Sequence, residues 1–132
     1  MLKIRIETIP HNQHRYPMVG DYWDDPDGTL EVRVSEMNDP RYEFLVAFHE
    51  LIEKELCRQR GISEQEVTRF DLLFEDELAQ GLRDPDDEPG DAPDAPYRRE
   101  HAFATNMERL LAHEMGVDWA TYERVLEGLY DE

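Results

Sequence analysis

PRYEFLVAFHELIEKELCRQR, residues 40–60, is the stretch that decides the fold. It holds no internal glycine or proline, and its apolar residues recur every three or four positions, as they do along one side of an α-helix. Asn38 or Asp39 can cap the helix before Pro40, and Gly61 can end it. The pattern therefore predicts a helix over residues 40–60.

Placing this helix at about 100° per residue sets which side faces the core. The apolar arc consists of Phe44, Leu45, Phe48, Leu51, Ile52 and Leu56. His49 and Glu53 lie together at the edge of that arc, and Glu50 lies roughly 60° further around. We therefore expect the arc to pack on the core and the His–Glu pair to open towards a pocket.

Short strands are predicted before this helix. Leu2, Ile4 and Ile6 alternate with charged residues, and residues 30–35 repeat this pattern, which is typical of strands with one buried face. Between them, residues 24–28 read DDPDG, a cluster that favours a chain reversal. We predict a two- or three-stranded antiparallel sheet that includes a β-hairpin.

More helices are predicted after residue 60. Ser63 and Glu66 form a capping box that opens a helix ending near Gly81. A third helix is expected from Pro96 to Gly116, with an apolar side made of Phe103, Met107, Leu110, Leu111 and Met115. Asp118 caps a last short helix. The fold class is therefore α+β, with an N-terminal sheet packed on three to four amphipathic helices in one domain, residues 1–132.

Residues 81–96, GLRDPDDEPGDAPDAP, interrupt the helices with an acidic, proline- and glycine-rich segment. It has almost no apolar side chains to bury, so burial cannot offset the entropy lost on ordering it. We expect a mobile surface loop.

The charge balance limits the possible partners. The chain has 32 acidic and 14 basic residues and a formal charge of -18, which repels nucleic acids and anionic membranes. The same field attracts cations, basic peptides or a protein surface that normally binds DNA. Cys57 is the only cysteine, and the N-terminus has no unbroken apolar stretch, so we expect the cytoplasm of a bacterium or of a phage-infected host.

His49, Glu50 and Glu53 form a His-Glu-x-x-Glu segment, which suggests a metal site. Residues four apart on a helix project in the same direction, and an imidazole with a carboxylate suits zinc or a similar divalent cation. His101 is the preferred third ligand because it lies beside the apolar side of the third helix, and Asp71 is the second choice. Glu108 is placed to support a ligand.

The segment resembles the zincin metallopeptidases, whose signature is His-Glu-x-x-His on a helix that follows a strand. The resemblance covers about twenty residues and implies a minimal zincin-like arrangement, with His49 and Glu53 as ligands and Glu50 as general base. Glu53 replaces the second histidine, so manganese or iron becomes an alternative to zinc. The helical segments, with YRREHAFATNMERLL at 97–111, also resemble short uncharacterised phage and prophage proteins.

Three other interpretations stay open. Glu50 and Glu53 can be solvated helix charges, with His49 bonded to a backbone carbonyl. The net charge suits a non-enzymatic inhibitor that competes with DNA for a host protein. The Glu-x-x-Glu spacing also resembles the all-helical nucleotide pyrophosphohydrolases, which carry a later Glu-x-x-Asp as well. That second half is absent, because the residue three positions after Glu75 is Leu78.

Overall fold

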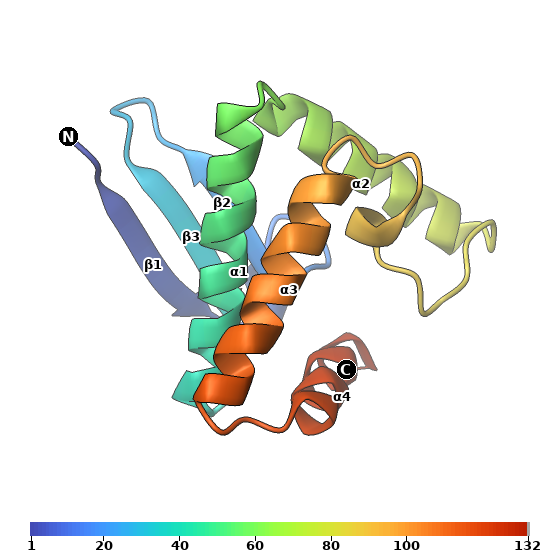
Figure 1. Cartoon of the computed structure of the whole chain (residues 1–132). Helices are drawn as coiled ribbons and strands as arrows, with labels where there is room; N and C mark the ends of the chain where they lie inside the picture. Colours follow the sequence, from blue (N-terminus) through green and yellow to red (C-terminus); the bar gives the residue numbers. More distant parts are fainter. Residues whose placement is uncertain (132) are drawn as a thin grey trace.

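The computed structural model describes residues 1–131, which form a three-stranded sheet and four α-helices (Figure 1). This arrangement confirms the α+β class. The elements are β1 (Ile4–Ile9), β2 (Gly20–Asp24), β3 (Leu30–Ser35), α1 (Pro40–Gln59), α2 (Glu64–Ala79), α3 (Arg98–Glu114) and α4 (Trp119–Gly128). Three short 3-10 turns, η1 (His11–Gln13), η2 (Pro89–Asp91) and η3 (Leu129–Asp131), lie between or after them.

The sheet has the order β1-β3-β2. β2, a strand that the alternation pattern does not predict, forms an antiparallel hairpin with β3 at the predicted chain reversal. The turn contains Gly28 at a φ of 89°, a left-handed value that suits glycine. β1 pairs with β3 in parallel, so the expectation of an entirely antiparallel sheet is wrong for this strand. Residues 10–19 carry the chain across the sheet, and β3 returns through the centre with Val32 and Val34 fully buried.

The predicted helix ends are confirmed by their capping contacts. Asp39 accepts a hydrogen bond from the backbone N–H of Arg41 at the start of α1, and Gly61 follows its end at a φ of 72°. Both hydrogen bonds of the capping box between Ser63 and Glu66 are present at the start of α2. These local signals depend on neighbouring residues alone, which is why the sequence predicts them well.

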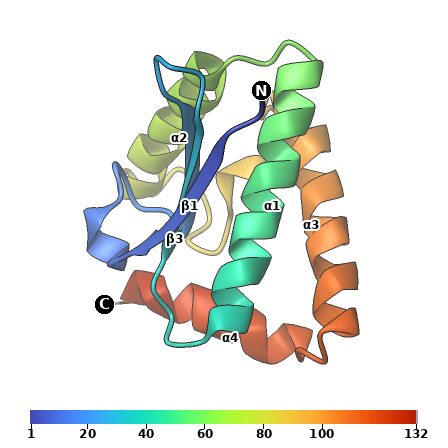
Figure 2. The ribbon, with the colours of Figure 1, turned by 90° about the vertical axis from the view of Figure 1, so that its left-hand side faces the viewer.

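α1 and α3 lie on one side of the sheet (Figure 2). α1 packs against β2 and β3, and α3 runs antiparallel along α1, as the Arg60–Glu100 and His49–Glu108 contacts show (Figures 1 and 2). α2 and α4 lie near opposite ends of this pair (Figure 2). No helix among residues 1–131 is both long enough and apolar enough to span a membrane.

The side of α1 that faces the core differs from the prediction. His49 and Glu53 are 7% and 5% exposed and lie in the middle of the buried side, whereas Phe44 is 58% exposed. Phe48 and Ile52 are only half-buried. The predicted apolar arc is therefore correct for Leu45, which is fully buried, but wrong for Phe44. The polar side chains of α1 find partners inside the molecule that the periodicity of one helix cannot reveal.

The acidic segment 81–96 is packed over its second half. Gly90, Ala92 and Ala95 are buried, and the two alanines join the apolar cluster around Phe74. The segment thus has an apolar anchor that its composition hid, whereas the mobility of its first half stays a prediction.

Candidate metal centre

Three side chains from α1 and α3 meet at one point inside the molecule. Nε2 of His49 lies 3.0 Å from Oε2 of Glu53, and Nδ1 of His101 lies 2.8 Å from the same oxygen. The two imidazole nitrogens are 3.3 Å apart. The three residues predicted as ligands therefore converge, although residues 49 and 101 lie far apart in the sequence.

The size of this triangle suits a small divalent cation. Ligand atoms about 2.0–2.1 Å from a tetrahedral zinc ion are about 3.3–3.4 Å from one another. The distances between the three atoms are 2.8, 3.0 and 3.3 Å, so shifts of a few tenths of an ångström reach that geometry. Two imidazoles and a carboxylate also form the donor set of zinc sites that keep a fourth position for water.

A carboxylate on the far side fixes the imidazole of His49. Glu108 of α3 lies with Oε1 2.7 Å from Nδ1 of His49, and its other oxygen accepts a hydrogen bond of 2.6 Å from the hydroxyl of Tyr122. Because Nδ1–H donates to Glu108, Nε2 can present a lone pair to a cation. Glu108 thus contacts the candidate ligand His49.

The carboxylate of Glu53 is oriented in a similar way. The hydroxyl of Tyr22, on β2, donates a hydrogen bond of 2.9 Å to Oε1 of Glu53. This contact leaves Oε2 directed at the two histidines. The sheet and α4 therefore contribute one tyrosine each to the same centre, which ties the whole fold to the positions of the ligand atoms.

The protonation of the cluster follows from its burial and its hydrogen bonds. Burial opposes the charged form of His49, but the hydrogen bonds to Glu108 and Glu53 outweigh it and raise the pKa of His49 well above its ordinary value. Burial also opposes ionisation of Glu53, but His101 and His49 hold its pKa at about 2. Without a bound cation, the positive charge of the protonated imidazoles therefore balances the negative charge of Glu53.

Glu50 lies beside the cluster, against the first residue of β2. A Cβ atom on Gly20 would lie 2.7 Å from both Cγ and Oε1 of Glu50, so the backbone of β2 passes directly over this side chain. Burial and the negative charge of Glu53 raise the pKa of Glu50 well above its ordinary value. Glu50 is therefore a neighbour of the candidate ligands, as predicted, and does not coordinate in the triangle.

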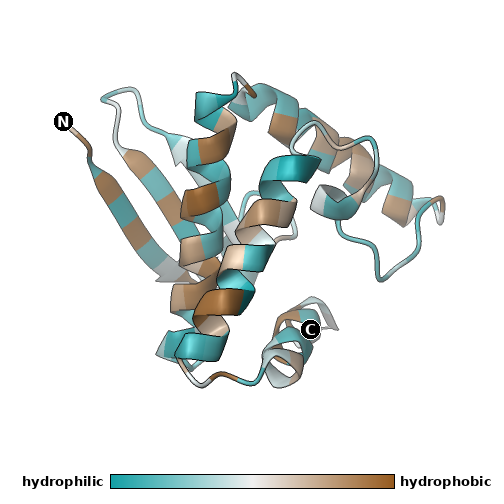
Figure 3. Cartoon of the chain, viewed as in Figure 1, coloured by the Kyte–Doolittle hydropathy of each residue, from teal (hydrophilic) through white to brown (hydrophobic). Residues whose placement is uncertain are grey.

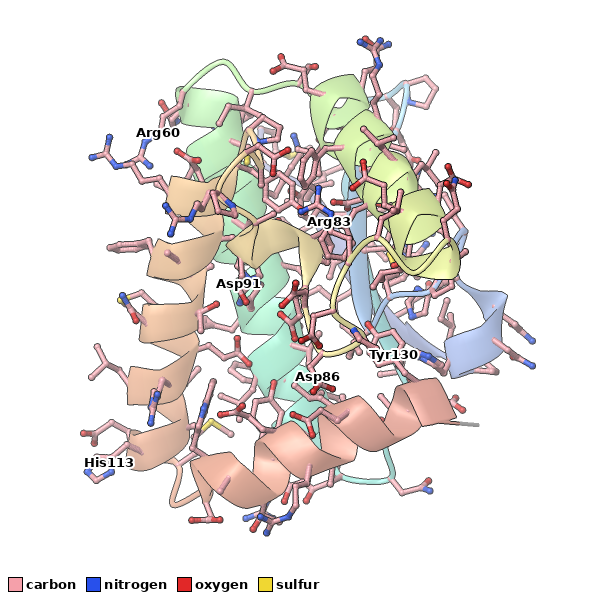
Figure 4. All side chains as sticks on the ribbon, turned by 90° about the vertical axis from the view of Figure 1, so that its right-hand side faces the viewer. Arg60, Arg83, Asp86, Asp91, His113 and Tyr130 are labelled. Atoms are coloured by element: carbon pink, nitrogen blue, oxygen red, sulfur yellow. The ribbon has the colours of Figure 1, made fainter. Side chains whose placement is uncertain are left out.

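The acidic segment closes over the other side of His101. Nε2 of His101 lies 3.6 Å from Oδ1 of Asp91 and 3.9 Å from Oε2 of Glu88, both on the segment that crosses in front of α1 and α3 (Figure 4). A Cβ atom on Gly90 would lie 2.5 Å from Cγ of His101. The glycine thus allows the segment to rest directly on the imidazole.

Asp71, the second choice for the third ligand, is directed elsewhere. Its carboxylate accepts a hydrogen bond of 2.9 Å from Tyr16 and another from Tyr97. Burial raises the pKa of Asp71 to about 6, although the hydrogen bonds from Tyr97 and Tyr16 oppose the shift. The partners of this half-buried carboxylate are thus two tyrosine hydroxyls and not the three candidate ligands.

Four residues of the centre were not identified from the sequence. These residues are Tyr22, Tyr122, Gly20 and Gly90. Gly20 carried no usable signal, because the sequence predicts no strand at residues 20–24. The two tyrosines carried none, because their hydroxyl contacts depend on tertiary packing.

Comparisons with known proteins add no family to this description. The chain matches no protein-family model, and no curated protein or solved structure is detectably similar to it. The resemblances to zincins and to phage proteins therefore stay predictions, and the functional argument rests on the geometry of the centre.

Proposed function

We propose that the chain is a metal-dependent hydrolase, with zinc as the preferred cation and a peptide-like substrate. His49, Glu53 and His101 hold the cation, and Glu50 acts as the general base. The convergence of two imidazole nitrogens and one carboxylate oxygen, within 3.3 Å of one another and inside the molecule, carries this proposal.

The supporting contacts favour a metal centre over a plain ion-pair cluster. Each ligand side chain has a second polar group on its far side: Glu108 for His49, Tyr22 for Glu53 and Asp91 for His101. Such outer contacts fix the tautomer and orientation that a coordinating side chain needs. An ion-pair cluster needs charge balance, but it does not need three ligand atoms directed at one point.

A bound zinc ion would polarise a water molecule and the substrate carbonyl. In this reaction Glu50 takes a proton from the water, whose oxygen bonds to the carbonyl carbon. The carbon–nitrogen bond then breaks, and Glu50 returns the proton to the departing amine. Glu50 lies beside Glu53 and His49, and it acts as the base in its ionised form, which the positive charge of a bound cation would favour.

Substrate can approach from the side of the acidic segment. Asp91, Arg99 and Ala102 line an open hollow there. Because Asp91 also lies 3.6 Å from His101, the hollow reaches the margin of the candidate centre.

Metal binding is tested first, by itself. Protein prepared without chelator is dialysed with zinc, and bound metal is counted by mass spectrometry and titrated by calorimetry. We expect one zinc per chain in the wild type and a large loss in His49→Ala and His101→Ala. The exposed His113 provides the matched control, since His113→Ala should bind zinc normally. Equal binding by all variants, or none by the wild type, contradicts the proposed centre.

Catalysis is tested separately with Glu50→Gln. This variant should bind zinc as the wild type does and lose cleavage of a mixed peptide library, because the amide cannot accept the proton. If Glu50→Gln cleaves as fast as the wild type, Glu50 is not the base. If zinc-loaded wild type cleaves nothing in peptide and ester panels, the hydrolase proposal fails while the metal centre stands.

A further inference from the structure

The outward side of the α1–α3 pair carries large apolar side chains among its charged residues. On α1, Phe44 is 58% exposed and Phe48 follows one turn later, half-buried. On α3, Phe103 and Leu110 are 48% and 64% exposed, and they lie seven residues apart on one side of the helix. Each helix thus carries an exposed apolar stripe, and Figure 3 shows hydrophobic residues recurring along both ribbons.

The two stripes belong to one surface. α1 and α3 lie side by side and antiparallel (Figure 1). The flank of α3 that faces α4 is identified by Arg109, whose guanidinium lies 5.4 Å from the ring centroid of Trp119. Phe103 and Leu110 lie on the opposite flank, which continues the outer side of α1.

This surface also avoids the negative charge of the rest of the chain. Residues 64–94 contain twelve acidic residues and two arginines. On α1 and α3, by contrast, Glu53, Glu100 and Glu108 point into the molecule. The exposed charged residues around the two stripes carry both signs and include Arg41, Arg58, Arg98, Arg99, Glu55 and Glu114.

We propose that a second copy of this chain docks on the α1–α3 surface, forming a two-fold dimer whose interface is a four-helix arrangement. Two-fold pairing places one surface against itself. Here the apolar stripes meet at the centre, and the mixed charges at the rim face their opposites across the axis. A chain of charge -18 repels its own copy over the acidic α2 side, so the balanced surface is the one suited to self-association.

The area of the α1–α3 surface is large enough for a second copy of the chain. A stable interface needs about 800 Å² per partner, with aromatic residues near its centre. Phe44 and Phe103 supply the aromatic anchors, and the two helices are about 30 and 25 Å long at about 1.5 Å per residue. A pair of such helices, about 10 Å apart, covers the required area. Arg99 borders both this surface and the hollow beside Asp91, but the candidate ligands lie inside the molecule, so the dimer does not depend on the proposed chemistry.

Sedimentation equilibrium on the whole chain tests the proposal. We expect a mass twice the 15.6 kDa of the chain, falling to the single-chain mass in Phe44→Glu and in Phe103→Glu. Leu73→Glu on α2 is the matched control, since Leu73 is 53% exposed and the added charge is the same, and it should stay dimeric. Circular dichroism checks that each variant is folded, and Leu110→Glu replaces any variant that is not.

The opposite results overturn the proposal. A wild type that stays a single chain at about 0.1 mM excludes a dimer of useful affinity. An assembly that survives Phe44→Glu and Phe103→Glu but dissociates in Leu73→Glu assigns the interface to α2 instead.

Discussion

α1 and α2 are neighbouring amphipathic helices that differ in the polar side chains they bury. α2 buries Val67 and Phe74, and none of its acidic residues is fully buried. α1 buries His49, Glu53 and Lys54 together with apolar residues such as Leu45, and it exposes Phe44. Hydrophobic periodicity therefore identifies both as helices but gives the correct orientation only for α2.

The difference shows what stabilises each interior. Around Phe74 the free energy comes from apolar burial, which needs no specific partner. Around His49 every polar atom needs a matching donor or acceptor, because an unpaired buried charge is costly. Glu108, Tyr22 and Tyr122 supply those partners. α1 can turn its phenylalanines outward only because this network compensates for the polar groups inside.

The largest effect is expected in the apolar cluster around Phe74 of α2. Phe74→Ala should lower the free energy of unfolding by about 3–5 kcal/mol, because it leaves a cavity around a side chain that is 1% exposed. Urea denaturation measures the change. The loss should be equal with and without zinc. A loss below about 1 kcal/mol would show that the cluster around Phe74 is loosely packed.

The stability supplied by the polar cluster around His49 of α1 should depend on bound metal. Zinc should raise the free energy of unfolding of the wild type by about 2.7 kcal/mol at about 100 times its Kd, and by about 4.1 kcal/mol at about 1,000 times. His49→Ala should show no such gain, whereas His113→Ala should match the wild type. Urea denaturation at graded zinc concentrations measures both. A similar gain in His49→Ala would move the binding site away from α1.

Much of the fold could be predicted from local patterns. The helix caps at Asp39, Ser63 and Asp118 and the turn at Gly28 depend on a few neighbouring residues, and the structure confirms them. The parallel pairing of β1 was not predictable in this way, because alternation shows that a strand exists but not which way its neighbour runs.

The candidate centre was predictable in its ligands and not in its surroundings. His49 and Glu53 share one helix, so their spacing alone places them together. His101 was chosen because it lies beside an apolar side of its own helix, and the packing of α3 on α1 brings it into contact. The roles of Tyr122 and Gly90 depend on contacts between distant segments, for which a single sequence gives no signal.

A smaller effect is expected where the acidic segment rests on the centre. Gly90→Ala places a methyl group 2.5 Å from Cγ of His101, and we expect a loss of about 1–3 kcal/mol in the free energy of unfolding. Zinc affinity should fall about 10-fold or more, because the imidazole is displaced. Gly128→Ala is the control, since a Cβ atom there meets no atom within 4 Å. Equal zinc affinity in both variants would show that the segment does not position His101.

The smallest effect concerns Asp71, the interior-facing carboxylate of α2 that makes this helix resemble α1. Its pKa is raised from 3.8 to about 6, so the folded protein binds this proton more tightly than the unfolded chain does. The contribution stabilises fully below pH 4 and is lost as the pH rises through 6. The shift corresponds to roughly 3 kcal/mol, which partial exposure reduces to about 1 kcal/mol.

Asp71→Asn removes this titration while keeping an acceptor for one of the two tyrosines. The stability of the wild type relative to the variant should therefore fall by about 1 kcal/mol between pH 4 and pH 7, as measured by urea denaturation at each pH. A difference that stays flat across this range would mean that Asp71 is already ionised at pH 4. The tyrosine hydroxyls would then stabilise its charge as effectively as the network around His49 stabilises the charges of α1.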